Sequence, residues 1–246
     1  MRTVGIVGCG AIGTLIAEAA DKNIVTCDEL VLFDVVFEKA QKLKGALHAP
    51  VTVVRSLDEM IKLKPTVIVE AASQQAAKEY IGKIVGEKID VIVMSVGALL
   101  ELGIESSRIH VPSGAIGGLD ALSSADLAGI DEVVLTTRKS PKVLDLDNRE
   151  EKVVYEGNAL EAVRRFPREM NVAATLALTV PREKVKVRVI SDPKVEKNVH
   201  EVKVKWKYGS MFLKFENDPH PDNPKTSALA AWSAIKLLKD ILEKHS

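Results

Sequence analysis

Short apolar runs alternate with amphipathic stretches through the first half of the chain. The runs are typical of buried parallel strands, and the stretches between them carry apolar residues at helical spacing. The expected strands are 3–7, 30–33, 51–54, 66–69, 90–94 and 108–111, and the expected helices are 11–21, 37–47, 57–63 and 74–85. Strands that alternate with helices predict βαβ units and a Rossmann-type, doubly wound parallel sheet.

The pattern changes after about residue 111. Strands are expected at 130–138, 184–190, 199–207 and 211–216, and helices at 158–166 and 171–180. Strict alternation of apolar and charged residues in two of these strands indicates a sheet with one wet face, as in antiparallel sheets. We therefore predict an α/β chain with a dinucleotide-binding domain at 1–110, completed by a C-terminal helix at 225–244. A second α+β domain with a largely antiparallel sheet is predicted at 111–224.

A glycine loop follows the first predicted strand and opens the first helix. In Gly8-Cys9-Gly10-Ala11-Ile12-Gly13, Gly8 suits a tight turn, Gly10 lets the backbone approach a pyrophosphate, and Gly13 lets the helix pack close to the strand. The amides of Ala11, Ile12 and Gly13 and the helix dipole favour an anion. A glycine turn in a non-binding α/β fold is the alternative.

An acidic residue ends the second predicted strand, 21 residues after the last loop glycine. The Asp34 carboxylate can accept hydrogen bonds from ribose hydroxyls and would repel a 2′-phosphate. No Arg or Lys occupies position 35 or 36, so the pattern favours NAD over NADP. Asp34 as a plain surface turn residue is the alternative.

Small residues follow the fourth strand. Ala71 and Ala72 would let a cofactor cross the carboxyl edge of the sheet, where α/β folds bind ligands. An ordinary helix start at the same place is an equal alternative, and the segment at 95–98 after the fifth strand has the same ambiguity.

Three segments of the second half carry more Gly, Asn, Pro and small polar residues than packing needs. In the loop at 112–120, Ser113 could bind a substrate carboxylate, or the loop could be a hinge. Lys225, Thr226 and Ser227 are expected at a helix N-terminus, where they suit a carboxylate or phosphate, or serve only as a cap. Asn171 could cap a helix or bond the nicotinamide carboxamide.

Histidine is the residue type expected for acid–base work near neutral pH. Of the five histidines, His200 at the start of an alternating strand and His220 in a proline-rich loop are the two candidates. The residues alone leave the choice between them open.

Composition narrows the function classes. Lys+Arg and Asp+Glu are both 34, so the chain has no basic excess that points to nucleic acid. No apolar run approaches the ~20 residues that span a membrane. The two cysteines, Cys9 and Cys27, are too few for a disulfide framework or a zinc site, so we expect no metal and a cytoplasmic setting.

Taken together, these segments resemble the L-aspartate dehydrogenase family. The resemblance is carried by GCGAIG at 8–13, SVGAL at 95–99, PSGAIGGLD at 112–120, NVAATLAL at 171–178 and ENDPHPDNPKTSALAAWSAI at 216–235. It spans nearly the whole chain, and the last motif is long and specific.

The resemblance implies NAD(P)-dependent oxidative deamination of L-aspartate, a dicarboxylate amino acid. Iminoaspartate forms first and is hydrolysed to oxaloacetate and ammonia, and it would supply pyridine-nucleotide synthesis. The family's catalytic histidine maps onto His200, and its cofactor contacts map onto Ala115 and Asn171. A homodimer formed through the second domain is also implied, and some members accept NADP.

Two other classes stay open. A homoserine dehydrogenase-like or dihydrodipicolinate reductase-like enzyme would share the N-terminal pattern but is not expected to carry NPKTS at 223–227. A non-catalytic NAD-sensing protein would keep the glycine loop without needing His200 or Lys225.

Overall fold

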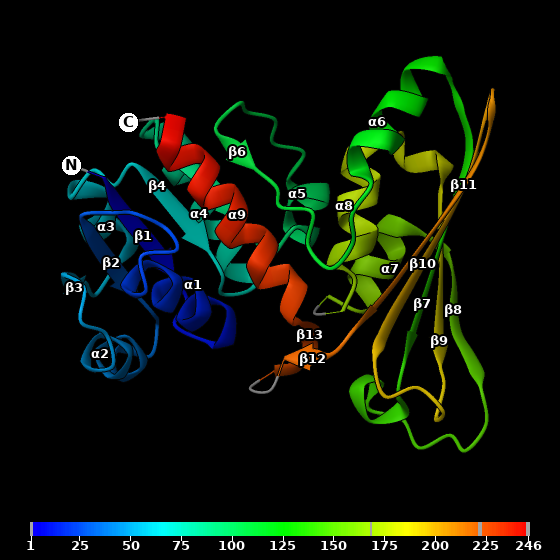
Figure 1. The fold of residues 1–246 in the computed structure, drawn as a ribbon, viewed down its shortest axis with the longest axis horizontal. Helices are drawn as coiled ribbons and strands as arrows, with labels where there is room; N and C mark the ends of the chain where they lie inside the picture. The colour runs from blue at the N-terminus through cyan, green and yellow to red at the C-terminus, as the bar shows by residue number, and fades with distance from the viewer. Residues whose placement is uncertain (1, 168, 221–222, 245–246) are drawn as a thin grey trace. The chain divides into compact units, whose positions relative to one another are not determined.

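Two compact units make up the chain in the computed structural model, which describes residues 2–167, 169–220 and 223–244, with only the backbone of 219–220 and 223–226. Backbone contacts assign Met1–Pro112 and Ala231–Ser246 to the first unit and Ser113–Ala230 to the second. Figure 1 shows the chain from its blue N-terminal unit, through the second unit, back to the red C-terminal helix of the first.

The first unit is built on six parallel strands. They are β1 (Thr3–Val7), β2 (Glu29–Phe33), β3 (Val51–Val53), β4 (Val67–Glu70), β5 (Asp90–Val93) and β6 (Ile109–His110). The helices are α1 (Ala11–Asp21), α2 (Phe37–Gly45), α3 (Leu57–Lys62), α4 (Gln74–Gly86), α5 (Gly97–Leu102) and α9 (Ala228–Lys244). The strand order β3-β2-β1-β4-β5-β6 is that of a doubly wound dinucleotide fold, which confirms the predicted Rossmann-type sheet.

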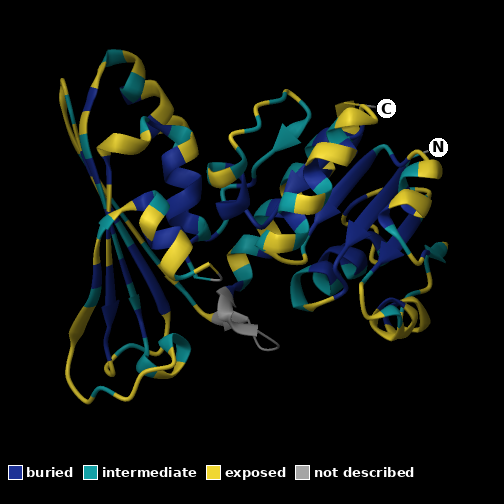
Figure 2. Cartoon of the chain, turned by 180° about the vertical axis from the view of Figure 1, so that it is seen from behind, coloured by how far each residue is buried: buried dark blue, intermediate teal, exposed yellow. Residues whose placement is uncertain are grey.

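Helices bury both faces of this sheet. On one face, Val7 and Ile68 pack in a cluster with Met60 of α3 and Ile81 of α4. On the other, α1 approaches Ile6, and α9 crosses the face turned to the viewer in Figure 1. Figure 2 shows the central strands as buried, the edge strands β3 and β6 as intermediate, and the helices with exposed residues on one side. Apolar residues along whole strands are therefore explained by cover on both sides.

The second unit has a five-stranded sheet with helices on one face. Its strands are β7 (Ile130–Lys139), β8 (Lys152–Asn158), β9 (Val185–Ser191), β10 (Asn198–Trp206) and β11 (Gly209–Asn217). The order is β11-β10-β7-β9-β8, and only the β7–β9 pair is parallel, which confirms the largely antiparallel sheet. The helices are α6 (Leu119–Ala128), α7 (Ala159–Arg165) and α8 (Asn171–Thr179), with short 3₁₀ turns at η1 (Pro141–Leu144) and η2 (Arg182–Lys184).

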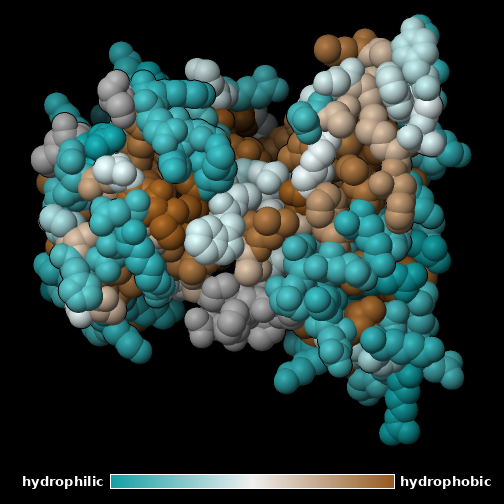
Figure 3. Space-filling view, viewed as in Figure 1, coloured by the Kyte–Doolittle hydropathy of each residue, from teal (hydrophilic) through white to brown (hydrophobic). Residues whose placement is uncertain are grey.

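Inward and outward positions alternate along the central strands of this sheet. Val133 and Leu135 of β7 and Val202 and Val204 of β10 are fully buried beneath the helices. Positions between them, such as Lys203, are exposed on the opposite face. On the side of the molecule seen in Figure 3, hydrophilic side chains surround patches of apolar ones in each unit.

The structure corrects the predicted start of the last helix. Residues 225–227 were expected at its N-terminus, but β13 (Asn223–Ser227) pairs with β12 (Pro219–His220), and α9 begins only at Ala228. Helix α6 and strand β8 were not predicted, whereas α5 begins at Gly97, where a helix start was one of two alternatives for the segment at 95–98. In α6, the hydroxyls of Ser123 and Ser124 donate to the carbonyls of Leu119 and Asp120, one turn earlier in the helix.

Within the described ranges, no helix is long and apolar enough to cross a membrane.

Candidate active site

The glycine turn after β1 is shaped by close backbone contacts. Gly8 has φ +96°, and its amide donates to the Phe33 carbonyl at 2.8 Å. A Cβ at Gly8 would lie 2.7 Å from the Ala71 carbonyl oxygen, and one at Gly13 would lie 1.9 Å from the Gly8 carbonyl oxygen. Only glycine fits at both positions, because the backbone after β4 runs against Gly8 and the first turn of α1 runs against the Gly8 carbonyl.

Gly10 differs from its two neighbours in the motif. A Cβ built there meets no atom within 4 Å, so the space in front of the turn is open. Gly10 also precedes α1 as its N-cap residue, and α1 has neither a side-chain cap nor an acidic residue in its first turn. The first-turn amides of Ala11, Ile12 and Gly13 therefore face a gap that an anionic pyrophosphate would fill. These residues fit a dinucleotide.

Asp34, directly after β2, ties the glycine turn to the neighbouring strand. Its Oδ2 accepts a hydrogen bond from the Cys9 amide at 2.8 Å, and its Oδ1 accepts one from the Val36 amide at 2.8 Å. The carboxylate is thereby fixed beside the turn with lone pairs left for ribose hydroxyls. Burial, followed by the nearby Asp34 charge, raises the pKa of the Cys9 thiol to about 12, so this cysteine stays protonated.

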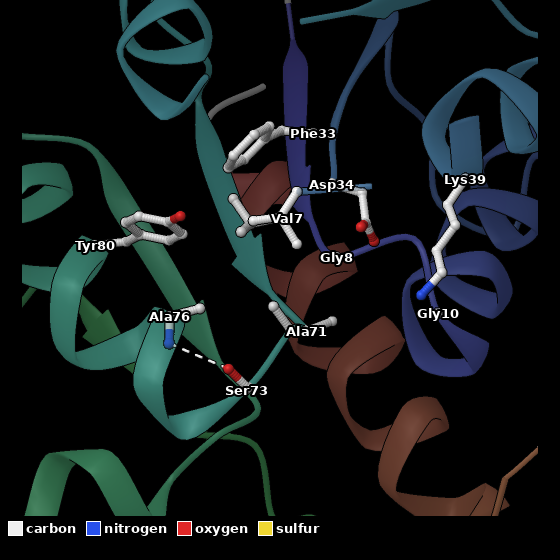
Figure 4. A pocket seen from close by; sticks show the side chains of 12 residues that line it. Val7, Gly8, Gly10, Phe33, Asp34, Lys39, Ala71, Ser73, Ala76 and Tyr80 are labelled. Atoms are coloured by element: carbon white, nitrogen blue, oxygen red, sulfur yellow. Dashed lines mark hydrogen bonds between the residues drawn. The ribbon is translucent and has the colours of Figure 1, made fainter. Parts of the chain in front are cut away.

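A cavity of about 270 Å³ lies at the carboxyl ends of β1, β2 and β4. Gly8, Gly10, Asp34, Ala71 and Ala72, all predicted cofactor contacts, line it together. Figure 4 shows that Lys39 of α2 also extends toward the glycine turn, beside Asp34. The preference for NAD was predicted from the absence of Arg and Lys at positions 35 and 36. Lys39 is a cation in the same cavity that this prediction did not take into account.

The aromatic wall of this cavity comes from two elements. Phe33 ends β2 and Tyr80 lies on α4, and their ring centroids are 6.1 Å apart. Ser73 caps α4 by accepting the Ala76 amide at 3.2 Å, which is drawn in Figure 4. A planar base has an apolar surface to rest on here.

A buried carboxylate holds the far rim of the cavity in place. Glu70 ends β4 and accepts hydrogen bonds from the Ala72 amide at 2.9 Å and from the Ser95 amide and hydroxyl at 3.0 and 2.9 Å. Burial raises the pKa of Glu70, and the hydrogen bonds from Ser95 and Ala72 oppose that rise. Glu70 thus joins the ends of β4 and β5 and fixes the Ala71–Ala72 segment.

In the second unit, His200 lies on the helix-covered face of β10. It is 3% exposed, and its Nδ1 is 3.1 Å from the hydroxyl of Thr137 on β7. Burial, and secondarily the charge of Lys139, lowers the pKa of His200 to about 3. The imidazole is therefore neutral and retains a lone pair that can accept a proton.

The predicted loop at 112–120 packs on the same sheet. The Ala115 carbonyl accepts a hydrogen bond from Asn217 Nδ2 at 2.9 Å, and Gly117 and Gly118 lie against Phe215 and Leu213 of β11. Ser113 is half-buried at the start of this loop.

The other predicted site residues lie on α8, β12 and β13. Asn171 is the first residue of α8, and its carbonyl accepts the Thr175 hydroxyl at 3.0 Å. Ser227 is buried at the end of β13. The side chains of His220, Lys225 and Thr226 lie outside the described residues, so the choice between His200 and His220 rests on the described surroundings of His200 alone.

Two polar residues close to His200 were not singled out from the sequence. Lys139 ends β7 and Asn198 begins β10, and each is 2% exposed. The alternation of β7, in which Val133, Leu135 and Thr137 point inward, places Lys139 on the same inward face. That alternation was the signal that could have revealed it.

Two family models match the chain, one over each part. The model described as "Aspartate dehydrogenase, C-terminal" matches residues 120–241. The model described as "Homoserine dehydrogenase, NAD binding domain" matches residues 8–107. The second match concerns the nucleotide-binding half, and the first concerns the half that carries His200.

Similar proteins cover both halves. The chain is 41% identical to the L-aspartate dehydrogenase of Methanothermobacter thermautotrophicus, over 99% of this chain and 97% of the relative. It is 40% identical to an L-aspartate dehydrogenase of Methanococcus maripaludis over 99% and 98%. Among solved structures, the aspartate dehydrogenase of Thermotoga maritima is 31% identical with a TM-score of 0.78, covering 98% of this chain and 97% of that one.

Proposed function

Because this chain belongs to the aspartate dehydrogenase family, we propose that it oxidises L-aspartate to iminoaspartate with NAD(P) as the hydride acceptor. The observation that carries cofactor binding is the open space at Gly10, with Asp34 in the same cavity, and the buried neutral His200 supports catalysis. The names of the relatives supply the substrate.

The first unit holds the cofactor in this proposal. The first-turn amides of α1, at Ala11, Ile12 and Gly13, bind the pyrophosphate, and Asp34 accepts the ribose hydroxyls. Ala71 and Ala72 leave room for the chain of the cofactor to pass the edge of the sheet. Ala115 and Asn171 contribute contacts from the second unit. When bound, the nicotinamide accepts the hydride that leaves the substrate α-carbon.

His200 handles the protons. The substrate amine must lose a proton before the α-carbon can release hydride, and the neutral imidazole accepts it. The Thr137 hydroxyl fixes the ring through Nδ1 and leaves Nε2 for the substrate. After hydride transfer, His200 releases the proton of the amine to solvent. Water then adds to the iminium carbon, His200 takes a proton from that water and returns it to the departing amine, and ammonia and oxaloacetate are released. Ser113, Lys225, Thr226 and Ser227 are kept as substrate-binding candidates.

We place the enzyme in the cytoplasm as a homodimer and its iminoaspartate in pyridine-nucleotide synthesis. The sheet face of the second unit opposite α6, α7 and α8 supports the dimer, because it presents Phe212, which is 57% exposed. Size-exclusion chromatography with light scattering on the protein and on Phe212→Asp tests this, and a monomer in both would overturn it.

A substrate panel tests the proposed reaction. The protein is incubated with NAD and separately with L-aspartate, L-homoserine or L-alanine while NADH absorbance is followed. We expect NADH with L-aspartate. A signal with L-homoserine instead would favour the homoserine dehydrogenase alternative, and NADH binding without turnover of any substrate would favour a sensor. His200→Ala should bind NADH normally and lose most turnover.

A further inference from the structure

The helix-covered face of the second unit's sheet is apolar except at one end. The buried positions of β7, β9 and β10 run from valine and leucine to polar residues as they approach this end. The register pairs Asn198 with Asn217, Lys139 with Ser191 and His200 with Thr137. Carrying the last pairing two residues further places Asn198 opposite Lys139, on the same face. We call Asn217, Asn198, Lys139 and Ser191 the polar row.

The two outer members of the polar row have partners within the protein. Asn217 Nδ2 donates to the Ala115 carbonyl at 2.9 Å. The Ser191 hydroxyl donates to Asn148 Oδ1 at 2.6 Å. These contacts fix the edges of the row, and Asn198 and Lys139 form its centre.

Asn198 is the anomaly in the row. Asn198 is 2% exposed, yet its Nδ2 has no hydrogen-bond partner among the described residues. A buried amide donor without an acceptor costs free energy, so such a group is expected where a ligand supplies the acceptor. The donor needs an oxygen or a nitrogen lone pair, which selects acceptors over other donors.

Lys139, opposite Asn198, sets the charge of that ligand. Its side chain is also 2% exposed, so it brings a positive charge into the buried face. His200 lies in the next layer of the same face. Because its imidazole is neutral, it adds no charge to the polar row. A ligand that accepts from Asn198 beside this ammonium is therefore anionic.

We propose that Asn198 Nδ2 and Lys139 bind a carboxylate of the substrate next to His200. The proposal rests on the proposed function for the identity of the substrate and names the subsite that recognises its charge. Residues two apart on a strand are about 6.8 Å apart. A four-carbon dicarboxylate can therefore reach the Asn198–Lys139 pair with one end while its amine meets the His200 ring.

The two residues are tested with variants that keep shape and remove polarity. Asn198→Leu and Lys139→Met are compared with Lys184→Met, an exposed lysine of the same unit. Loss of a charge-assisted contact should raise the KM for L-aspartate at least about 10-fold in each of the first two and leave it unchanged in the third. Because Asn198 Nδ2 has no partner among the described residues, Asn198→Leu should not lower Tm. A lower Tm with an unchanged KM would assign the pair a structural role and overturn the proposal.

Binding of succinate, followed by calorimetry, separates this proposal from the proposed reaction. Succinate carries both carboxylates without the amine and needs no turnover. Binding to the wild type that weakens at least about 10-fold in Asn198→Leu supports the subsite even if the wild type fails to oxidise L-aspartate, which would overturn only the proposed function. Equal affinity in wild type and both variants would overturn the subsite even if L-aspartate is oxidised.

Discussion

Replacement of His200 by glutamine should change how the stability of the protein depends on pH. His200 is buried with a folded-state pKa of about 3, whereas an unfolded histidine has a pKa of about 6.5. Above pH 6.5 the ring is neutral in both states. As the pH falls below 6.5, the unfolded chain gains a proton that the folded protein excludes, so stability is lost from pH 6.5 down to about pH 3.

The size of this loss follows from the two pKa values. At pH 4.5, two pH units below the unfolded value and still above the folded one, His200 alone should cost about 2.7 kcal/mol relative to pH 8. Glutamine does not titrate, and its amide can still pair with the Thr137 hydroxyl that lies 3.1 Å from His200 Nδ1. The variant should therefore lack this part of the acid destabilisation while every other group titrates as before.

Urea unfolding at pH 8, 6 and 4.5, followed by circular dichroism and by tryptophan fluorescence, measures the difference. Trp206 lies on the same strand as His200 and reports the second unit. We expect the wild type to lose about 2.7 kcal/mol more than His200→Gln between pH 8 and 4.5. A wild-type-minus-variant difference that stays constant over this range would refute the burial of a neutral imidazole.

Further predictions concern the cofactor cavity. Gly13→Ala should lower the free energy of unfolding by about 2 kcal/mol or more because its Cβ would lie 1.9 Å from the Gly8 carbonyl oxygen, as chemical denaturation would show. Gly10→Ala places its Cβ in open space and should keep the wild-type free energy of unfolding. The same Cβ would occupy the space in front of the turn, so the affinity for NADH should fall at least about 10-fold in a fluorescence titration. Asp34→Ala should lower the affinity for NADH and raise the ratio of the NADPH affinity to the NADH affinity, because it removes a carboxylate and leaves Lys39. An unchanged ratio would contradict this prediction. Glu70→Gln should lower the free energy of unfolding by about 2 kcal/mol, because the new NH₂ would face the amide donors of Ser95 or Ala72. A variant with the wild-type free energy of unfolding would contradict this prediction.

The nucleotide-binding half was predictable because its signals are local. Parallel strands buried on both faces read as apolar runs, and the turn glycines and Asp34 lie within one βαβ unit. What the sequence did not reveal is the second function of Asp34, whose two oxygens accept the Cys9 and Val36 amides. That contact depends on how the end of β2 approaches the turn, which no spacing rule specifies.

The second half was less predictable because its site depends on contacts between distant strands. Lys139 and Asn198 are 59 positions apart and meet only through the β7–β10 register. A lysine at the end of a strand is usually solvated, so its burial was not expected from residue type. The hydroxylated, weakly amphipathic α6 and the short β8 were missed for a related reason, since packing against the sheet decides their structure.

The Asn198–Lys139 pair affects how strong a base His200 is. Burial lowers the pKa of His200 first, and the Lys139 charge lowers it further, so the free protein holds a weak base. A carboxylate bound beside Lys139 offsets that positive charge and favours the protonated imidazole, which makes His200 a stronger base once the substrate is in place. A substrate without that carboxylate does not offset the effect of Lys139 on the imidazole, so His200 stays a weak base. The same lysine would then select the dicarboxylate twice, by attracting its charge and by making the proton transfer depend on it.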